Sequence, residues 1–174
     1  RWVIRLAADA PSPPHIVTVL ARCEKNPCYQ LLMAQGLRYE YPDLSVRFRG
    51  AEGMGGVVFG AQNPANFYAA IVDLAKSMAQ VIRVVDGYEQ VLAQTPVTLK
   101  QVEWHSLRAQ RNTIINKDFI EMFVDGILVL SVEDQTLGVG EVGLLAGGNT
   151  VLSFDTFHAV PLFSHRPFSP PPAY

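Results

Sequence analysis

Two Asp-Gly pairs, each placed between apolar runs, constrain the fold of this 174-residue chain more than any other feature. The clearer pair is Asp125-Gly126 within FIEMFVDGILVLSV, and the second is Asp86-Gly87 between MAQVIRVV and YEQVLA. Both central positions of a type I′ turn need a positive φ, which Asp and Gly tolerate, so each pair predicts a two-residue β-hairpin. The chain is therefore expected to fold mainly as β-sheet.

Strand-like runs occupy most of the remaining sequence. Leu44, Val46 and Phe48 alternate with Ser and Arg, which is the period-two pattern of a strand with one buried face. About a dozen such runs between Gly and Asn turns predict an all-β fold, a two-sheet antiparallel jelly-roll sandwich. The expected strands are 2–6, 15–21, 43–49, 56–62, 66–74, 79–85, 89–94, 103–110, 119–124, 127–132, 141–146 and 151–160.

The composition limits the classes of partner. Hydrophobic residues make up 49% of the chain and charged residues 17%, against about 25% charged in typical soluble domains, which suggests an apolar face covered by a protein partner. The 14 basic and 16 acidic residues give a net charge of −2, and without a basic run no nucleic acid partner is expected. No stretch reaches the ~18 apolar residues of a membrane helix, so we expect no transmembrane segment.

Cys23 and Cys28 are the only cysteines. They are either two small core residues or a disulfide across a short loop. Their even number and close spacing favour the disulfide, and with it an exported, periplasmic or extracellular protein, with peripheral membrane attachment as an alternative. Because the chain begins at Arg1 rather than Met, we expect a processed, trimmed or truncated product.

Residues 163–174 differ in composition from the rest and are expected to form a tail on a domain that spans residues 1–162. The tail sequence FSHRPFSPPPAY is rich in proline, which removes backbone donors, so the tail should run extended over the surface. It would lie either in a groove of its own domain or on a partner. The residues expected to contact a partner are Pro167, Phe168, Pro170, Pro171, Pro172 and Tyr174.

Six segments, in a fixed order, carry a family resemblance: GGVVFGAQNPANFYAAIVD, VVDGYEQVLAQTPVTL, VEWHSLRAQ, FVDGILVLSVED, GEVGLLAGGNTV and FDTFHAVPL. Together with WVIRLAADAPSPPHIV upstream, they make nearly the whole chain similar to the concanavalin A-like lectin/glucanase (LamG-like) β-sandwiches. The resemblance is nearest to the bacterial domains of unknown function grouped with 3-keto-disaccharide hydrolases. It implies two antiparallel sheets, one of them concave. In relatives the concave face often holds sugars, and calcium is found in some.

The chain departs from this family at three places. Relatives commonly carry polar side chains, often Arg, where this chain has Gly60 and Ile71, and an acidic pair where it has Asp155-Thr156. Sugar sites depend on directed hydrogen bonds, so these changes remove polar groups from the inherited site. We therefore expect a non-catalytic interaction module, an accessory or structural subunit that docks on a larger assembly, with a membrane-associated assembly as one alternative.

A carbohydrate-binding, lectin-like module is the alternative function. Its ligand residues would be Gln62, Asn66 and Tyr68, although the Tyr68 ring could instead belong to an aromatic core layer.

A glycoside hydrolase is the third alternative, and it requires two carboxyl groups about 5–9 Å apart. Among the 16 acidic residues no pair is spaced i, i+2 along a strand, and Asp125, four residues after Glu121, belongs to the hairpin turn. No catalytic residue is assigned. No cofactor is expected either, because Asp155, the calcium candidate, supplies few of the about 6–8 oxygens that calcium needs.

Overall fold

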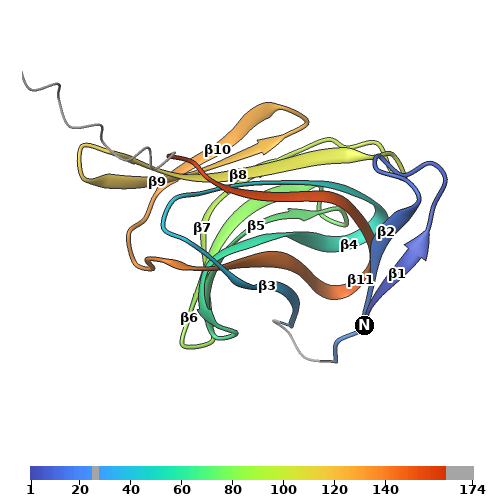
Figure 1. Cartoon of the computed structure of the whole chain (residues 1–174), viewed down its shortest axis with the longest axis horizontal. Helices are drawn as coiled ribbons and strands as arrows, with labels where there is room; N and C mark the ends of the chain where they lie inside the picture. Colours follow the sequence, from blue (N-terminus) through green and yellow to red (C-terminus); the bar gives the residue numbers. More distant parts are fainter. Residues whose placement is uncertain (25–27, 164–174) are drawn as a thin grey trace, which may run out of the picture.

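The computed structural model describes residues 1–24 and 28–163. This part of the chain forms eleven strands and no helix (Figure 1). The strands are β1 (Trp2–Leu6), β2 (His15–Ala21), β3 (Tyr29–Tyr39), β4 (Pro42–Asn63), β5 (Asn66–Asp73), β6 (Met78–Val85), β7 (Tyr88–Pro96), β8 (His105–Ile114), β9 (Lys117–Val124), β10 (Ile127–Glu133) and β11 (Gly140–Pro161).

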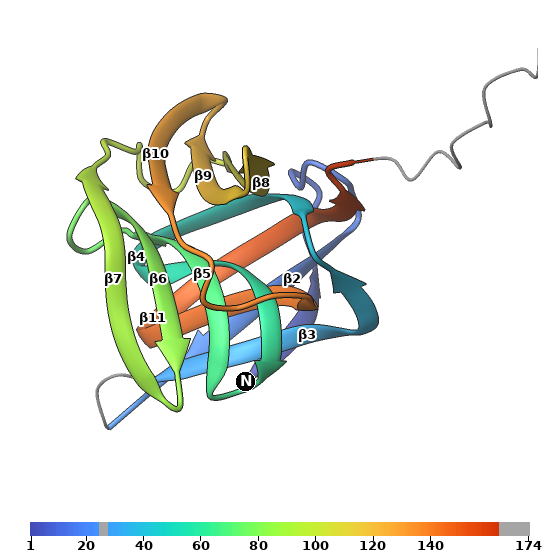
Figure 2. The ribbon, with the colours of Figure 1, turned by 90° about the vertical axis from the view of Figure 1, so that its left-hand side faces the viewer.

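The strands form two antiparallel sheets that face each other. Sheet I has the order β1, β2, the second half of β11, the first half of β4, β8, β9 and β10. Sheet II has the order β3, the first half of β11, the second half of β4, β5, β6 and β7. In Figure 2, β5, β6 and β7 lie side by side below β8, β9 and β10. The predicted two-sheet sandwich is therefore confirmed.

Two long strands, β4 and β11, pass from one sheet into the other. In β4 the crossing falls in the glycine-rich segment 50–56, where Gly53 has a φ of 93°. In β11 it falls at Gly147 and Gly148, where the latter has a φ of 64° and the pairing with β4 shifts register. Glycine adopts a positive φ without the steric cost that a Cβ brings. Glycine therefore allows one continuous strand to bend between two layers.

The main core lies between the sheets. Its largest side chains include Phe59, Tyr68, Leu107, Met122 and Phe154, each with at most 1% of its surface exposed. They come from both sheets and pack as one cluster. Full burial of such a side chain stabilises the fold by roughly 1.5–3 kcal/mol, so this interior layer holds the two sheets together.

Both hairpin predictions are confirmed by the backbone. Asp86 and Gly87 have φ values of 51° and 80°, and Asp125 and Gly126 have 48° and 79°. These pairs connect β6 to β7 and β9 to β10. Positive φ at both central positions is the signature of the type I′ turn.

The strand predictions differ from the structure in two respects. The pairs of strands expected at 43–49 and 56–62, and at 141–146 and 151–160, are in fact single strands, β4 and β11. The glycines that suggested breaks are the points of bending. Strand β3 was not expected, because YQLLMAQGLRY consists mainly of residues without a β preference.

Candidate functional site

A groove crosses the outer face of sheet II. It consists of two neighbouring cavities of about 410 Å³ and 190 Å³, and Tyr29, Leu31 and Pro64 line both. The larger cavity runs along β3 toward the connection between β4 and β5. The smaller one reaches β7. We refer to the two cavities together as the sheet II groove.

The groove exists because sheet II is strongly curved. Tyr29 of edge strand β3 donates a hydrogen bond from its hydroxyl to Glu89 of β7, the opposite edge. In a flat sheet the two edges of six strands would lie about 24 Å apart, beyond the reach of these side chains. The Tyr29 ring also contacts Phe67 edge-on, with ring centroids 6.2 Å apart. The outer face of sheet II is therefore concave.

An apolar cluster forms the floor of this concave face. Its members point away from the main core, yet Val58, Phe67, Ile71, Ile82 and Leu145 are each at most 1% exposed. Curvature brings them together, and partly buried side chains from β3 and β4 cover them. The covering side chains are Tyr29, Leu31, Met33 and Met54.

The larger cavity combines this apolar surface with polar groups at one end. Gln35, Asn63 and Glu141 line it beside Leu31 and Met33. Glu141 is half-buried and accepts a hydrogen bond from the backbone N–H of Gly36 at 3.4 Å. The cavity therefore offers apolar contact beside amide groups that donate and accept hydrogen bonds and a carboxylate that accepts them.

The disulfide between Cys23 and Cys28 lies immediately before Tyr29. Backbone bonds anchor this segment to the bend in β11: the Gly148 N–H donates to the Cys28 carbonyl at 3.1 Å. The Cys23 N–H donates to the Asn149 side chain at 3.4 Å. Burial, and then the hydrogen bond to Glu89, raise the pKa of Tyr29 above its usual range. The Tyr29 hydroxyl therefore remains a donor.

Tyr68, a candidate ligand residue, lies in the main core with 0% exposure. Its ring stacks on Phe59 with centroids 5.4 Å apart. The hydroxyl donates to Asp134 and accepts from the Leu137 N–H at 2.9 Å. Burial and the bond to Asp134 raise the pKa of Tyr68 to about 12. Since no face of this ring is accessible to a ligand, the structure places Tyr68 in the aromatic core layer, the alternative left open by the sequence.

The other two candidate ligand residues lie at the ends of strands, Gln62 near the end of β4 and Asn66 at the start of β5. Gln62 is exposed and donates to the Val139 carbonyl. The Asn66 side chain donates to Asn63 at 3.0 Å and accepts from the Asp86 N–H at 3.0 Å. Both side chains thus join neighbouring connections, and neither lines a cavity of the groove.

Two of the three positions at which the family pattern changes, Gly60 and Ile71, differ in orientation. Ile71 belongs to the floor of the concave face. Gly60 has a φ of 59°, and a Cβ there would stand 3.1 Å from the Tyr68 ring. A polar side chain at position 71 would thus enter the covered apolar floor of the concave face, whereas one at position 60 would enter the main core.

Asp155, the calcium candidate, accepts hydrogen bonds from the backbone. Its carboxylate accepts from the Ser12 N–H at 2.6 Å and from the Thr156 N–H at 2.7 Å. The bond from Ser12 holds the connection between β1 and β2 against β11, whereas the bond from Thr156 is local to β11. Within residues 1–24 and 28–163, no group of three His, Cys, Asp or Glu side chains is arranged to hold a metal.

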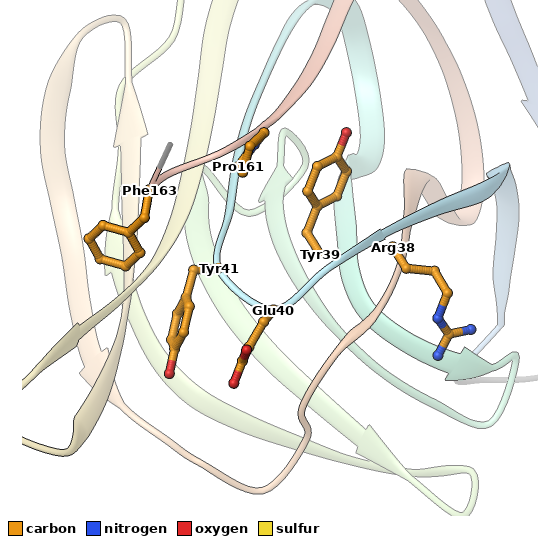
Figure 3. A pocket seen from close by; sticks show the side chains of 6 residues that line it. All are labelled: Arg38, Tyr39, Glu40, Tyr41, Pro161 and Phe163. Atoms are coloured by element: carbon orange, nitrogen blue, oxygen red, sulfur yellow. The ribbon is translucent and has the colours of Figure 1, made fainter. Parts of the chain in front are cut away.

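A separate cavity of about 380 Å³ lies where β3 turns into β4 (Figure 3). Tyr39, Tyr41 and Phe163 contribute aromatic rings to it, and the Tyr41 and Phe163 rings meet edge-on at 5.5 Å. The Tyr39 hydroxyl donates to the Ala159 carbonyl at 3.0 Å, which fixes its ring. The expected partner-docking residues of the tail, from Pro167 to Tyr174, lie outside the described residues. No helix long and apolar enough to cross a membrane occurs in the part of the chain that the structure describes.

Sequence reasoning missed the residues that line the sheet II groove, chiefly Tyr29, Gln35, Glu89 and Glu141. Tyr29 and Gln35 lie on the unexpected strand β3. Glu89 and Glu141 begin predicted strands, but which face they share depends on the curvature. One usable signal was Tyr29 directly after Cys28, because a disulfide fixes the side chain that follows it.

Comparison with known proteins identifies the fold. No protein family model and no curated protein matches this sequence. Among solved structures, the carbohydrate-binding module CBM66 from Bacillus subtilis has a TM-score of 0.71 at 13% identity, covering 91% of each chain. A legume lectin-like domain from Entamoeba histolytica has a TM-score of 0.62 at 14% identity, covering 94% of this chain and 89% of its own. Galectin LEC-6 from Caenorhabditis elegans has a TM-score of 0.52 at 13% identity, covering 82% of this chain and 95% of its own. The chain therefore has the concanavalin A-like lectin β-sandwich fold that its sequence resembles.

Proposed function

We propose that this chain is a non-catalytic module that binds an oligosaccharide in the sheet II groove. The observation that carries the proposal is the lining of the larger cavity, where Tyr29, Leu31 and Met33 lie beside Gln35 and Glu141. A sugar ring presents a C–H face and a hydroxyl edge, which suit apolar surface and hydrogen-bond acceptors respectively. The volume of about 410 Å³ lies in the usual range of ligand sites, roughly 300–1,000 Å³.

The structural relatives add support of a general kind. They are a carbohydrate-binding module, a legume lectin-like domain and a galectin. One fold can host unrelated functions, so the proposal depends on the groove of this chain rather than on its neighbours.

The environments of the groove carboxylates favour binding over catalysis. Glu89 is exposed and accepts the Tyr29 hydrogen bond, and Glu141 is half-buried. A glycosidase general acid is usually kept protonated by an apolar pocket. Neither groove carboxylate is fully enclosed in this way, since both remain accessible to solvent. Turnover of aryl glycosides by the wild-type protein would contradict this part of the proposal.

Export to a periplasmic or extracellular compartment is part of the proposal. The disulfide between Cys23 and Cys28 supports it, because disulfides persist mainly in oxidising compartments. Mass spectrometry of thiol-alkylated protein from its native source would test it, since free thiols there would contradict export.

The binding test compares Tyr29→Ala with wild type by isothermal titration calorimetry against a panel of neutral oligosaccharides. We expect the wild type to bind at least one of them and Tyr29→Ala to bind at least about tenfold more weakly, which corresponds to about 1.4 kcal/mol. Tyr88→Ala is the matched control. Tyr88 precedes Glu89, is 82% exposed and points to the other side of β7.

Two results would contradict the carbohydrate proposal. One is absence of binding by the wild type across the panel. The other is equal weakening by Tyr29→Ala and Tyr88→Ala, which would place the ligand away from the groove. Circular dichroism of each variant would establish that the fold is intact.

Association with another protein is the second candidate function. It was expected from the composition, and the free edge of strand β1 favours it. Among the described strands, β1 pairs with β2 alone, so its other edge is free. Ile4 and Leu6 lie on the same side of β1 as Trp2. Their side chains are nevertheless 72% and 77% exposed. A free edge with exposed apolar side chains is a template for strand addition.

A second copy of this chain is the occupant that suits β1. An antiparallel pair centred on Ile4 would set Trp2 opposite Leu6 and Val3 opposite Arg5. Apolar side chains would then meet on one face, and no Arg would face another Arg. Light scattering after size-exclusion chromatography should show a dimer for wild type and for Ile127→Lys, and a monomer for Ile4→Lys. A monomeric wild type would contradict this second candidate.

A further inference from the structure

We infer that the sheet II groove selects oligosaccharides that carry free, protonated amino groups, and disfavours acidic sugars. This inference rests on the proposed function. Its starting point is the charge of the lining: the charged residues that line the two cavities are Glu89 and Glu141, both acidic.

No cation of the described residues neutralises the two carboxylates, and each can accept further hydrogen bonds from a ligand. Among the described residues, neither has an ion-pair partner within 4 Å. Arg38 is the cross-strand neighbour of Glu141, but it lines the separate cavity of Figure 3 instead. Each carboxylate accepts one hydrogen bond, from Tyr29 or from the Gly36 N–H. An ionised carboxylate has about four acceptor sites, so most of these sites stay open.

Carboxylates accept hydrogen bonds and cannot donate them, so the ligand must supply the donors. A protonated amine supplies three donors and an opposite charge, and charge-assisted hydrogen bonds are roughly twice as strong as neutral ones. A sugar carboxylate or sulfate would bring a like charge to this lining, which is destabilising.

The remaining lining suits an amino sugar rather than a flexible cation alone. Tyr29 presents a partly exposed aromatic ring in the smaller cavity, beside Leu31. Aromatic rings attract cations held over their faces, and they also pack against the C–H face of a sugar ring. One ligand that carries both features is an oligosaccharide of glucosamine type.

The test is calorimetric titration of the full chain with three oligosaccharide probes of equal length. They are glucosamine oligomers at a pH where their amines are protonated, their N-acetylated counterparts, and galacturonic acid oligomers. We expect the glucosamine oligomers to bind at least about tenfold more tightly than the N-acetylated ones, with a preference that falls as salt is added. The uronic acid oligomers should bind most weakly.

The variant Glu141→Gln separates charge from shape. It should lower the ratio of the affinity for free-amine oligomers to the affinity for N-acetylated oligomers, because one of the two groove carboxylates then carries no charge. Glu40→Gln is the matched control, because Glu40 is exposed and lines the separate cavity. The control should keep the preference.

The outcomes distinguish the two claims. Equal affinity for free and acetylated amines, or tightest binding of the uronic acid oligomers, would overturn the charge selection and leave the proposed function standing. Absence of binding by any oligosaccharide, including the case in which a trilysine peptide binds, would overturn both.

Discussion

Tyr68 of β5 donates its hydroxyl hydrogen to Asp134, which follows β10, and so ties sheet II to the connection that leads into β11. The same oxygen accepts the Leu137 N–H at 2.9 Å. One buried hydroxyl thus holds a segment that closes one side of the sandwich. Arg83 of β6 reinforces the link through an ion pair with Asp134 and a hydrogen bond to Thr136 at 2.6 Å.

Tyr68→Phe should therefore destabilise the protein although it preserves the ring. The Leu137 N–H would lose its acceptor and Asp134 a donor. An unsatisfied buried polar group costs about 1–3 kcal/mol, and urea denaturation would measure the loss. The control Tyr88→Phe, at a residue 82% exposed, should change stability by less than about 0.5 kcal/mol. Similar effects of the two variants would show that this hydrogen bond contributes nothing.

Stability should decline in acid partly through Asp134. Burial alone would raise the pKa of Asp134, but hydrogen bonds from Tyr68 and Thr136 and the charge of Arg83 together lower it below its usual range. A carboxyl group whose pKa is lower in the folded state than in the unfolded state stabilises the folded state. This stabilisation is complete at pH values above the unfolded-state pKa of about 3.9, and it is lost as the pH falls through the folded-state pKa. The stability difference between wild type and Asp134→Asn should therefore shrink below about pH 4. A difference that stays constant from pH 6 to pH 2 would contradict this role.

Removing the disulfide should destabilise the fold moderately. The loop between Cys23 and Cys28 is short, and the loop-entropy estimate for a loop of this size is about 2 kcal/mol. The double variant Cys23→Ser/Cys28→Ser should lose about this much in a denaturant titration. Wild type in reducing agent should behave as the variant does. Unchanged stability in both cases would show that β3 is held without the cross-link.

Gly56→Ala tests the close contact between β4 and β5. A Cβ at Gly56 would overlap the Ala70 carbonyl, which belongs to the backbone and cannot rotate away. Overpacking of this kind typically costs about 1–3 kcal/mol, measured as a loss in unfolding free energy. Gly138→Ala is the control, because a Cβ there meets nothing within 4 Å. If Gly56→Ala were as stable as the control, β4 and β5 could move apart without loss of stability, and the close contact would not contribute to the fold.

Ile115 offers a stabilising substitution. It is 91% exposed and has a φ of 50° in the turn between β8 and β9, followed by Asn116 at 61°. A β-branched residue is strained at positive φ, at a cost on the order of 1 kcal/mol, whereas Asn tolerates it. Ile115→Asn should raise the melting temperature, while Ile114→Asn, at ordinary φ, should not. A lower melting temperature for Ile115→Asn would contradict the assignment of strain.

The sequence by itself determined the local features of this protein. Asp86-Gly87 and Asp125-Gly126 predicted two hairpins because their conformation depends on the two residues themselves. The bounds expected for β1 and β2 match the structure, since period-two alternation is also a local property. The family resemblance extended these features to the correct two-sheet fold.

Only the tertiary structure decided the continuity of β4 and β11 and the position of the groove. Glycine at 50–56 is compatible with a break or a bend, and the choice depends on which strands pair beyond it. Tyr29 and Glu89 are sixty residues apart in the chain and meet because sheet II curls. Ile71 and Tyr68, near neighbours on one strand, lie on opposite faces, one in the floor of the groove and the other in the core. The curvature of sheet II, and the face of the sheet to which each side chain points, arise from the packing of all eleven strands together. No short segment of the sequence contains that information.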